Sequence, residues 1–124
     1  MSDFAPVIGV IETYFDGLYH ADVSLLEGVF HPKAIYATAD ETPLLHRTME
    51  EYFPVVAKRE SPASRNEARR DVIEGIEFAG DNTAFARVRC SIGTKDFIDF
   101  LTIVRTDGEW RIMAKIFHMK ERGS

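Results

Sequence analysis

Apolar residues recur every three or four positions along the first part of the chain, which is the pattern of an amphipathic helix. The stripe comprises Phe4, Val7, Ile8, Ile11, Tyr14, Phe15 and Leu18. It predicts a helix of about 17 residues. Asp3 can cap this helix, and Pro6 lies in its first turn, where a missing N–H does no harm.

Two shorter helices are predicted further along the chain. Asp22 can cap the first of them, and Pro32 is expected to end it. Its apolar stripe comprises Leu25, Leu26, Val29 and Phe30. The other is expected to start at Thr48, because Thr48 and Glu51 have the spacing of a capping box. Pro54 lies far inside that segment, so we expect a kink there or a later helix start.

The second half of the chain has the pattern of strands. Residues 34–38, and then 71–79, 83–92, 96–106 and 110–118, are predicted strands. The last four are separated by short glycine-containing breaks, which are typical of hairpin turns, whereas the polar stretch 58–69 is predicted to be a long surface loop. Helices followed by an antiparallel meander indicate one α+β domain, residues 1–124, with its N-terminal helices packed on a strongly curved antiparallel sheet.

Strand alternation assigns the side chains of the meander to two faces. The face expected to meet the helices comprises Ala84, Ala86, Val88, Cys90, Phe97, Asp99, Leu101, Ile103, Trp110, Ile112, Ala114, Ile116 and His118. Asp99 is the anomaly on this apolar face, and His118 lies near its open end. The opposite face comprises Phe85, Arg87, Arg89, Ile98, Phe100, Thr102, Val104, Arg111, Met113, Lys115 and Phe117.

The opposite face has the composition of a protein interface, since aromatic residues, Met and Arg are enriched in interfaces. We therefore predict a homodimer that packs through this outer sheet face, and a cross-strand pair between Glu74 and Arg89.

The composition of the chain limits the kinds of partner and the kinds of site that we expect. The formal net charge is −5, from 20 acidic and 15 basic residues, which argues against nucleic acid because phosphate binding needs basic surfaces. Cys90 is the single cysteine, so no disulfide or Cys-rich metal site is expected. The N-terminus lacks the basic start of a signal peptide, and no apolar run is long enough to span a membrane. We expect a cytoplasmic protein without membrane contact.

The order of elements resembles the nuclear transport factor 2-like superfamily. The resemblance covers almost the whole chain and is carried by "ADVSLLEGVFHPKA", residues 21–34, and by the ending "DGEWRIMAKIFH", residues 107–118. The chain looks most like the small bacterial members described as lumazine-binding or SnoaL-like. The resemblance implies a cone-shaped fold with a pocket at its wide end, often in a dimer. The superfamily includes isomerases, dehydratases and cyclases as well as non-catalytic domains, so the fold alone names no function.

The same resemblance points to Tyr14 and Asp99 as candidate catalytic residues. Their positions are similar to those of the two oxyanion-stabilising donors of ketosteroid isomerases, a system in which a neutral carboxylic acid donates a hydrogen bond. The carboxylate base of those enzymes aligns with Thr38, which cannot abstract a proton, although Asp40 lies two residues on. The alternative is that Tyr14 is a core residue and that Asp99 is a buried carboxylate bonded to Tyr14, Trp110 or the backbone.

Further candidates are weaker. His118 could act as a general acid or base, or could simply end a strand in solvent. The aromatic residues expected to line the pocket, if they are not plain core, are Tyr36, Tyr52, Phe53 and Trp110. His20, His31 and His46 lack metal-ligand spacing, and no nucleotide-binding motif occurs, so neither a metal nor a cofactor is expected.

Three functions are consistent with the sequence. The first is a pocket that binds a small apolar, aromatic or polycyclic molecule, such as a pterin or flavin-like ring. The second is a cofactor-free isomerase, cyclase or dehydratase that uses Tyr14, Asp99 and His118 for proton transfer. The third is a non-catalytic dimerisation domain.

Overall fold

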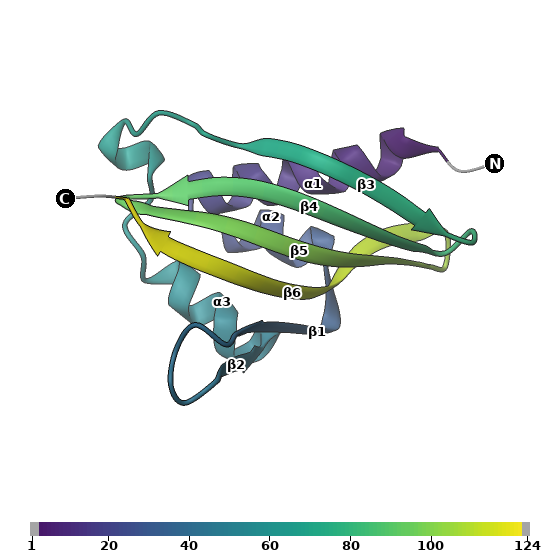
Figure 1. Cartoon of the computed structure of the whole chain (residues 1–124). Coiled ribbons are helices and arrows are strands. Elements are labelled where there is room, and N and C mark those ends of the chain that lie inside the picture. The colour runs from purple at the N-terminus through teal and green to yellow at the C-terminus, as the bar shows by residue number, and fades with distance from the viewer. Residues whose placement is uncertain (1–2, 123–124) are drawn as a thin grey trace.

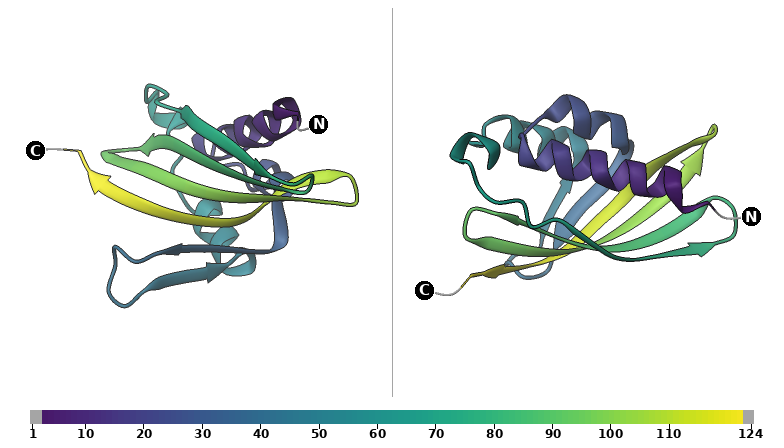
Figure 2. Two further views of the ribbon diagram at one scale, coloured as in Figure 1. Left: turned by 45° about the vertical axis from the view of Figure 1, so that its right-hand side comes forward. Right: turned by 90° about the horizontal axis from the view of Figure 1, so that it is seen from above.

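Between residues 3 and 122, which the computed structural model describes, three α-helices lie on one face of a six-stranded sheet (Figure 1). The helices are α1 (Phe4–Tyr19), α2 (Val23–Val29) and α3 (Met49–Ala57), and a 3-10 turn, η1, covers Ala63–Arg65. The strands are β1 (Phe30–Thr38), β2 (Leu45–Thr48), β3 (Val72–Ala79), β4 (Thr83–Ile92), β5 (Lys95–Thr106) and β6 (Glu109–Glu121). Seen from above, α1 and α2 lie together over the curved sheet (Figure 2).

The helix starts follow the predicted caps. The Asp3 carboxylate accepts a hydrogen bond from Ala5 N–H at 3.0 Å, and the Asp22 carboxylate accepts one from Leu25 N–H at 3.3 Å. Thr48 and Glu51 form the reciprocal capping box at the start of α3. Each cap satisfies backbone donors that a helix leaves free in its first turn. Pro54 lies inside α3 and does not delay the start of this helix.

Two details of the N-terminal half differ from the prediction. Helix α2 ends at Val29, and β1 starts at Phe30, so Pro32 lies within a strand and not at a helix end. Pairing explains this early start, because Phe30 already lies opposite Ile112 of β6, with a register shift before Ile35. The short strand β2 was not predicted, and it extends the sheet beyond β1.

The predicted meander is confirmed, with strand ends within three residues of those expected. The strand order is β2-β1-β6-β5-β4-β3, and neighbouring strands are antiparallel except for β1 and β6, which run parallel. The predicted antiparallel sheet is therefore correct apart from this central parallel pair. Figure 1 shows β1 and β2 at the lower edge and β3 at the upper edge.

A β-bulge in β6 reverses the predicted faces of its second half. Thr102 lies opposite Ala114, but the next pair is Ile103 with Ile112, so Met113 is the extra residue. Because side chains alternate along a strand, one extra residue exchanges the two faces beyond it. The assignments for five residues were therefore wrong: Lys115 and Phe117 are buried against the helices, whereas Ala114, Ile116 and His118 lie on the outer face, with Ile116 and His118 exposed.

The core lies between the helices and the inner face of the sheet. Inward residues of β4 and β5 are buried as predicted, among them Val88, Asp99 and Leu101. Helices α1 and α2 approach closely at Gly17, where a Cβ atom would lie 2.6 Å from Leu26 Cδ2. A larger residue at position 17 would therefore push the two helices apart.

Candidate functional site

Tyr14, Asp99 and Lys115 meet in the core and form what we call the central cluster. The Tyr14 hydroxyl of α1 donates a hydrogen bond of 2.5 Å to Asp99 Oδ2 of β5. Lys115 Nζ of β6 lies 4.0 Å from the same oxygen. Tyr14 and Asp99 are fully buried, and Lys115 is 4% exposed. The predicted pairing of Tyr14 with Asp99 is thus present, with a cation beside it that was not predicted.

Aromatic rings surround the Lys115 ammonium. The ring centroids lie 5.2 Å (Tyr14), 5.3 Å (Tyr36), 5.3 Å (Phe117), 5.8 Å (Tyr52) and 5.9 Å (Phe97) from Nζ. We call these rings the aromatic cage. A cation attracts the negative faces of aromatic rings at such distances. The cage therefore offsets part of the cost of removing Lys115 from water.

The environment of the central cluster raises the pKa of both Tyr14 and Lys115. Burial and the neighbouring Asp99 carboxylate raise the pKa of Tyr14, so this phenol stays protonated and acts as a hydrogen-bond donor. Burial by itself would lower the pKa of Lys115, but the charge of Asp99 together with smaller contributions from Tyr52, Tyr36 and Cys90 outweighs burial, and the pKa rises. Lys115 is therefore a cation at neutral pH, and it lies beside a carboxylate that accepts from Tyr14.

One oxygen of Asp99 remains without a partner. Oδ2 accepts from Tyr14 and lies 3.9 Å from Cys90 Sγ, whereas Oδ1 is buried and has no hydrogen-bond partner within residues 3–122. An unpaired buried acceptor costs about 1–3 kcal/mol. The thiol of Cys90 does not satisfy Oδ1, because its contact is with Oδ2, where it is a weak neutral donor.

Among the described residues, 3–122, no second carboxylate joins the central cluster. Thr38 is buried at the end of β1, and its hydroxyl accepts a hydrogen bond from Asp40 N–H at 3.1 Å. The Asp40 side chain instead accepts from Met119 N–H at 3.1 Å, and His118 Nδ1 lies 2.7 Å from it. These two hydrogen bonds lower the pKa of Asp40. Asp40 thus ties the end of β1 to β6, and the structure gives it no contact with Tyr14 or Asp99.

His118 is placed differently from the prediction, which put it at the open end of the inner face. The bulge at Met113 turns it to the outer face, where its side chain is 58% exposed beside Asp40. The strand that carries His118 thus directs it away from the central cluster.

The aromatic residues expected at the pocket lie in three different surroundings in the structure. The rings of Tyr36 and Tyr52 stack at 4.3 Å between centroids and belong to the aromatic cage. Phe53 is partly buried and packs on Phe30 at 6.2 Å. Trp110 lies near the β5–β6 turn, where its ring packs on Phe78 at 5.9 Å. The structure therefore gives Trp110 no contact with the Lys115 cage.

Lys115 is the site residue that the sequence did not reveal. In a regular strand without the bulge, Lys115 would face outward and Ile116 inward. With the bulge, Lys115 faces inward and Ile116 outward. Both registers put an apolar residue inward, either Ile116 or Phe117, so the hydrophobic pattern cannot choose between them.

Two other classes of site find no support within residues 3–122. No group of three or more His, Cys, Asp or Glu side chains is arranged to hold a metal ion there. Over the same residues, no helix is both long enough and apolar enough to cross a membrane.

The fold defines the class of protein. The chain is 23% identical to a nuclear transport factor 2-like protein of unknown function from Shewanella baltica, with a TM-score of 0.84 over 94% of this chain and 93% of that one. A similar protein of unknown function from Silicibacter pomeroyi is 23% identical, with a TM-score of 0.80 over 94% and 95% of the two chains. A ketosteroid isomerase-like protein from Erwinia carotovora atroseptica is 10% identical, with a TM-score of 0.73 over 94% and 95%.

The fold is therefore the nuclear transport factor 2-like fold, as the sequence predicted. Within that class, residues 2–118 match the family described as "Putative lumazine-binding", and the chain belongs to this family. No curated protein matches the chain.

Proposed function

We propose that this protein binds a flat aromatic or heterocyclic small molecule beside the central cluster. The observation that carries the proposal is an ion pair in the core, Asp99 with Lys115, held inside an aromatic cage and with Asp99 Oδ1 left unpartnered. The family description, "Putative lumazine-binding", favours a pteridine-like ring.

The first support is energetic. Removing two charges from water costs several kcal/mol for each ion, and a buried ion pair often stabilises a protein less than apolar residues of similar size would. The cage and the Tyr14 hydrogen bond offset part of this cost, but Oδ1 of Asp99 receives no hydrogen bond within residues 3–122. A core that served packing alone would be more stable without these charges, so a ligand-binding role accounts for them better.

The second support is chemical complementarity. Oδ1 of Asp99 can accept a hydrogen bond from a ligand N–H or O–H group. The Lys115 ammonium can donate to a ligand carbonyl, and the rings of Tyr36 and Tyr52 already stack on each other. A pteridine-dione carries N–H donors and carbonyl acceptors on the edge of a flat ring, which matches this set.

Ligand entry requires movement, because Tyr14 and Asp99 are fully buried. Phe97 of β5 and Met119 of β6 lie opposite each other, and both are only partly buried. Phe97 also belongs to the aromatic cage. Rotation of these two side chains would open a route from solvent to Lys115.

A ligand screen by thermal denaturation tests the proposal. Lumazine and riboflavin are the probes, and naphthalene is the flat apolar control without hydrogen-bonding groups. A ligand that binds only the folded state raises the melting temperature, by an amount equivalent to about 2.7 kcal/mol at 100 times its Kd. We expect a shift with lumazine or riboflavin and none with naphthalene.

A matched pair of variants locates the binding. Asp99→Asn removes the acceptor charge of the central cluster, whereas Asp81→Asn makes the same change in the exposed β3–β4 turn. The thermal shift should be lost in Asp99→Asn and kept in Asp81→Asn. Absence of any shift in the native protein, or a full shift in Asp99→Asn, would contradict the proposal.

Cofactor-free isomerisation, cyclisation or dehydration is a second candidate, and the donor geometry of Tyr14 favours it. The hydroxyl is held at 2.5 Å from Asp99 and would stabilise a developing oxyanion if the ligand replaced that carboxylate as acceptor. The candidate lacks a carboxylate base, since Thr38 occupies the equivalent position and Asp40 binds His118. Any ligand from the screen can be assayed for turnover, which Tyr14→Phe should abolish under this candidate.

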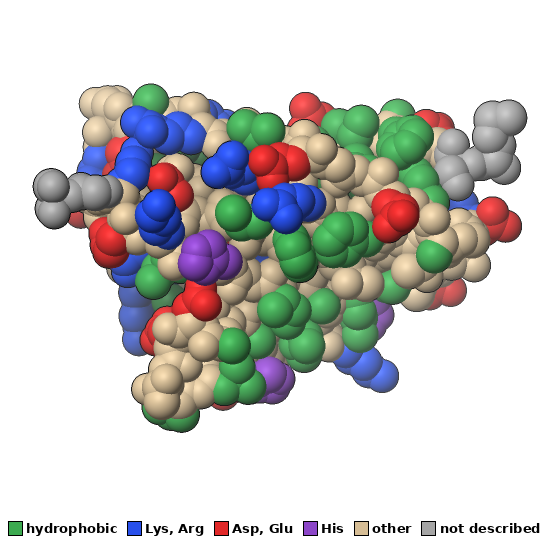
Figure 3. Space-filling view, viewed as in Figure 1, with side chains coloured by type: hydrophobic (Ala, Val, Ile, Leu, Met, Phe, Trp, Pro, Cys, Tyr) green, Lys and Arg blue, Asp and Glu red, His purple; other side chains and the backbone are tan. Residues whose placement is uncertain are grey.

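We also propose that the protein forms a homodimer through its outer sheet face. Side chains on that face form an apolar patch, which we call the outer patch, and Figure 3 shows hydrophobic side chains grouped across the middle of it. The outer patch comprises Ile35, Phe85, Phe100 and Ile116, each 36–43% exposed. The predicted Glu74–Arg89 pair lies beside it at 3.4 Å, with Arg87 closer to Glu74 at 2.7 Å.

A further inference from the structure

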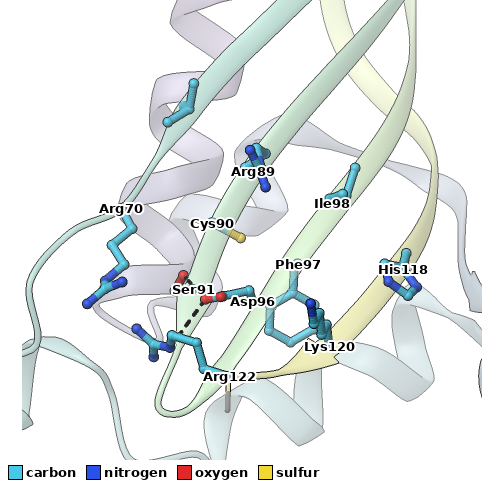
Figure 4. A pocket seen from close by; sticks show the side chains of 11 residues that line it. Arg70, Arg89, Cys90, Ser91, Asp96, Phe97, Ile98, His118, Lys120 and Arg122 are labelled. Carbon is cyan, nitrogen blue, oxygen red and sulfur yellow. Dashed lines mark hydrogen bonds and ion pairs between the residues drawn. The ribbon is translucent and has the colours of Figure 1, made fainter.

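A cavity of about 530 Å³ opens on the outer face, at the end of the sheet where β4 turns into β5 (Figure 4). We call it the basic cavity. Its lining residues are Arg70, Val72, Arg89, Cys90, Ser91, Asp96, Phe97, Ile98, His118, Lys120 and Arg122. In Figure 4 the helices lie behind the strands that carry these side chains.

The charge of this cavity is opposite to that of the whole protein. Arg70, Arg89, Lys120 and Arg122 contribute positive charge, and Asp96 is the carboxylate among the lining residues. The full chain nevertheless has a formal net charge of −5. Cations that gather in a concave site repel one another, and the low-dielectric walls focus their field on an anion at the centre.

The cations are not all neutralised by neighbouring carboxylates. Asp96 accepts from Ser91 at 2.6 Å and lies 3.5 Å from Arg122. Within residues 3–122, Arg70 and Lys120 have no carboxylate within ion-pair distance. Arg70 and Arg122 also line a smaller adjoining cavity of about 220 Å³, together with Glu67, which is paired with Arg65 at 2.6 Å.

The other part of the lining is apolar. Val72 is 49% exposed, and Ile98 and Phe97 are partly buried between the charged residues. A free inorganic anion would gain nothing from these side chains, whereas a molecule with an apolar body would cover them. The combination of cations with an apolar wall is therefore selective for a ligand that has both parts.

From these observations we infer that the basic cavity binds an anionic amphiphile, a small molecule with a carboxylate or phosphate group on an apolar or aromatic body. Arg70 and Lys120 would bind the anionic group, since guanidinium and ammonium groups form strong charge-assisted hydrogen bonds with both anions. Val72, Ile98 and Phe97 would contact the body. Val72, Ile98 and Lys120 face outward, on the opposite side of the sheet from Lys115, whereas the Phe97 ring also belongs to the aromatic cage and borders both sites. The inference does not depend on the ligand proposed for the central cluster, because the anionic group would bind Arg70 and Lys120, which are not part of that cluster.

The cavity is also separate from the outer patch. Arg89 and Ile98 lie two residues along β4 and β5 from Arg87 and Phe100, toward the β4–β5 turn. A second copy seated on the outer patch would leave the basic cavity at the rim of that interface. Binding should therefore be measured together with the oligomeric state.

Titration monitored by nitrogen-15 NMR tests the inference. The probes are 1-naphthyl phosphate, 1-naphthoate and the neutral 2-naphthol. We expect saturable shifts of the Val72, Ile98 and Lys120 amides with at least one of the two anions, and binding at least tenfold weaker for 2-naphthol. The ratio between phosphate and carboxylate then identifies the preferred anionic group.

Two double variants that change the net charge equally serve as the test and its control. Arg70→Gln/Lys120→Gln removes the two cations without an ion-pair partner, and each lost charge-assisted hydrogen bond is worth roughly tenfold in affinity. Lys33→Gln/Arg105→Gln removes two exposed cations outside the cavity. The first variant should weaken anion binding at least tenfold with an unchanged melting temperature and oligomeric state, and the second by less than twofold.

Three results would overturn the inference. They are shifts that map to residues outside the basic cavity, equal binding of 2-naphthol and the two anions, and equal loss of affinity in the two double variants.

Discussion

At the scale of single residues, Lys115 and Asp99 decide what the core can do. Each is an ion that would be costly to bury alone, and each depends on the other at 4.0 Å. The Tyr14 hydroxyl and the aromatic cage complete the arrangement. The three polar groups of the cluster thus depend on one another. Removal of one leaves the others buried without their partner, whereas removal of all three leaves no buried group unpaired.

This coupling predicts opposite effects of partial and complete replacement. Lys115→Met leaves Asp99 as an uncompensated buried charge and should lower the free energy of unfolding by about 3–5 kcal/mol. The triple variant Tyr14→Phe/Asp99→Val/Lys115→Met has no polar side-chain group in the cluster and should be as stable as the native protein, or more stable by about 1–4 kcal/mol. Urea denaturation measures both values.

The same triple variant separates stability from function. It should fail to bind lumazine or riboflavin even though it is folded. A triple variant as unstable as Lys115→Met would show that the cluster stabilises the fold, and the energetic support for the proposed ligand would be lost.

At the scale of secondary-structure elements, the β6 bulge sets the composition of the site. Met113 adds one residue between Ile112 and Ala114, and from there on β6 presents Lys115 and Phe117 to the helices. The bulge lies in the part of β6 that pairs with β5 on one edge and with the parallel strand β1 on the other, and Ala114 is paired to both Thr102 and Ile35. Bulges bend and twist a strand, which is what a sheet that curves around helices requires.

Deletion of Met113 tests the role of the bulge. Deleting the extra residue leaves Ile112 opposite Ile103 and Ala114 opposite Thr102 in a regular alternation, so Lys115 and Phe117 should still face the helices. The deletion removes only the local bend and twist that the bulge supplies. We expect a cooperative thermal transition by circular dichroism, at a melting temperature lower than that of the native protein.

Met113→Ala is the matched control, because it keeps the residue count and removes only the side chain. It should retain a cooperative transition with a melting temperature lower by a few degrees. Loss of the cooperative transition in the deletion alone would contradict this expectation and show that the sheet requires the bend of β6 as well as its register.

At the scale of the whole molecule, the sheet separates two surfaces with different roles. Its inner face holds the central cluster, and its outer face carries the outer patch and the basic cavity. Phe85 and Phe100 are in contact with each other, with ring centroids 5.3 Å apart, and remain exposed to solvent. Contiguous apolar groups of this kind usually mark an interaction surface.

The proposed homodimer makes a direct prediction. Phe100→Lys places a charge in the middle of the outer patch and should convert the dimer to a monomer, because burying an unpaired charge is costly. Light scattering after gel filtration measures the mass. Leu44→Lys, at a side chain 60% exposed between β1 and β2, is the control and should leave the mass unchanged. A native protein that is monomeric at micromolar concentration would exclude the homodimer.

Local sequence patterns are enough to predict the three helices, the five longer strands, their order and most of the faces that their side chains take. Period-3.6 and period-2 patterns, the caps at Asp3, Asp22 and Thr48, and the turns of the meander are local features, so local sequence suffices to predict them. Asp99 also stood out locally, as a polar residue in an apolar alternation. Tertiary structure decided the rest: the parallel pairing of β1 with β6, the small strand β2 and the bulge at Met113. These depend on contacts between distant segments, and for that reason Lys115, which the bulge turns inward to meet Asp99, could not be assigned to the core from the pattern alone.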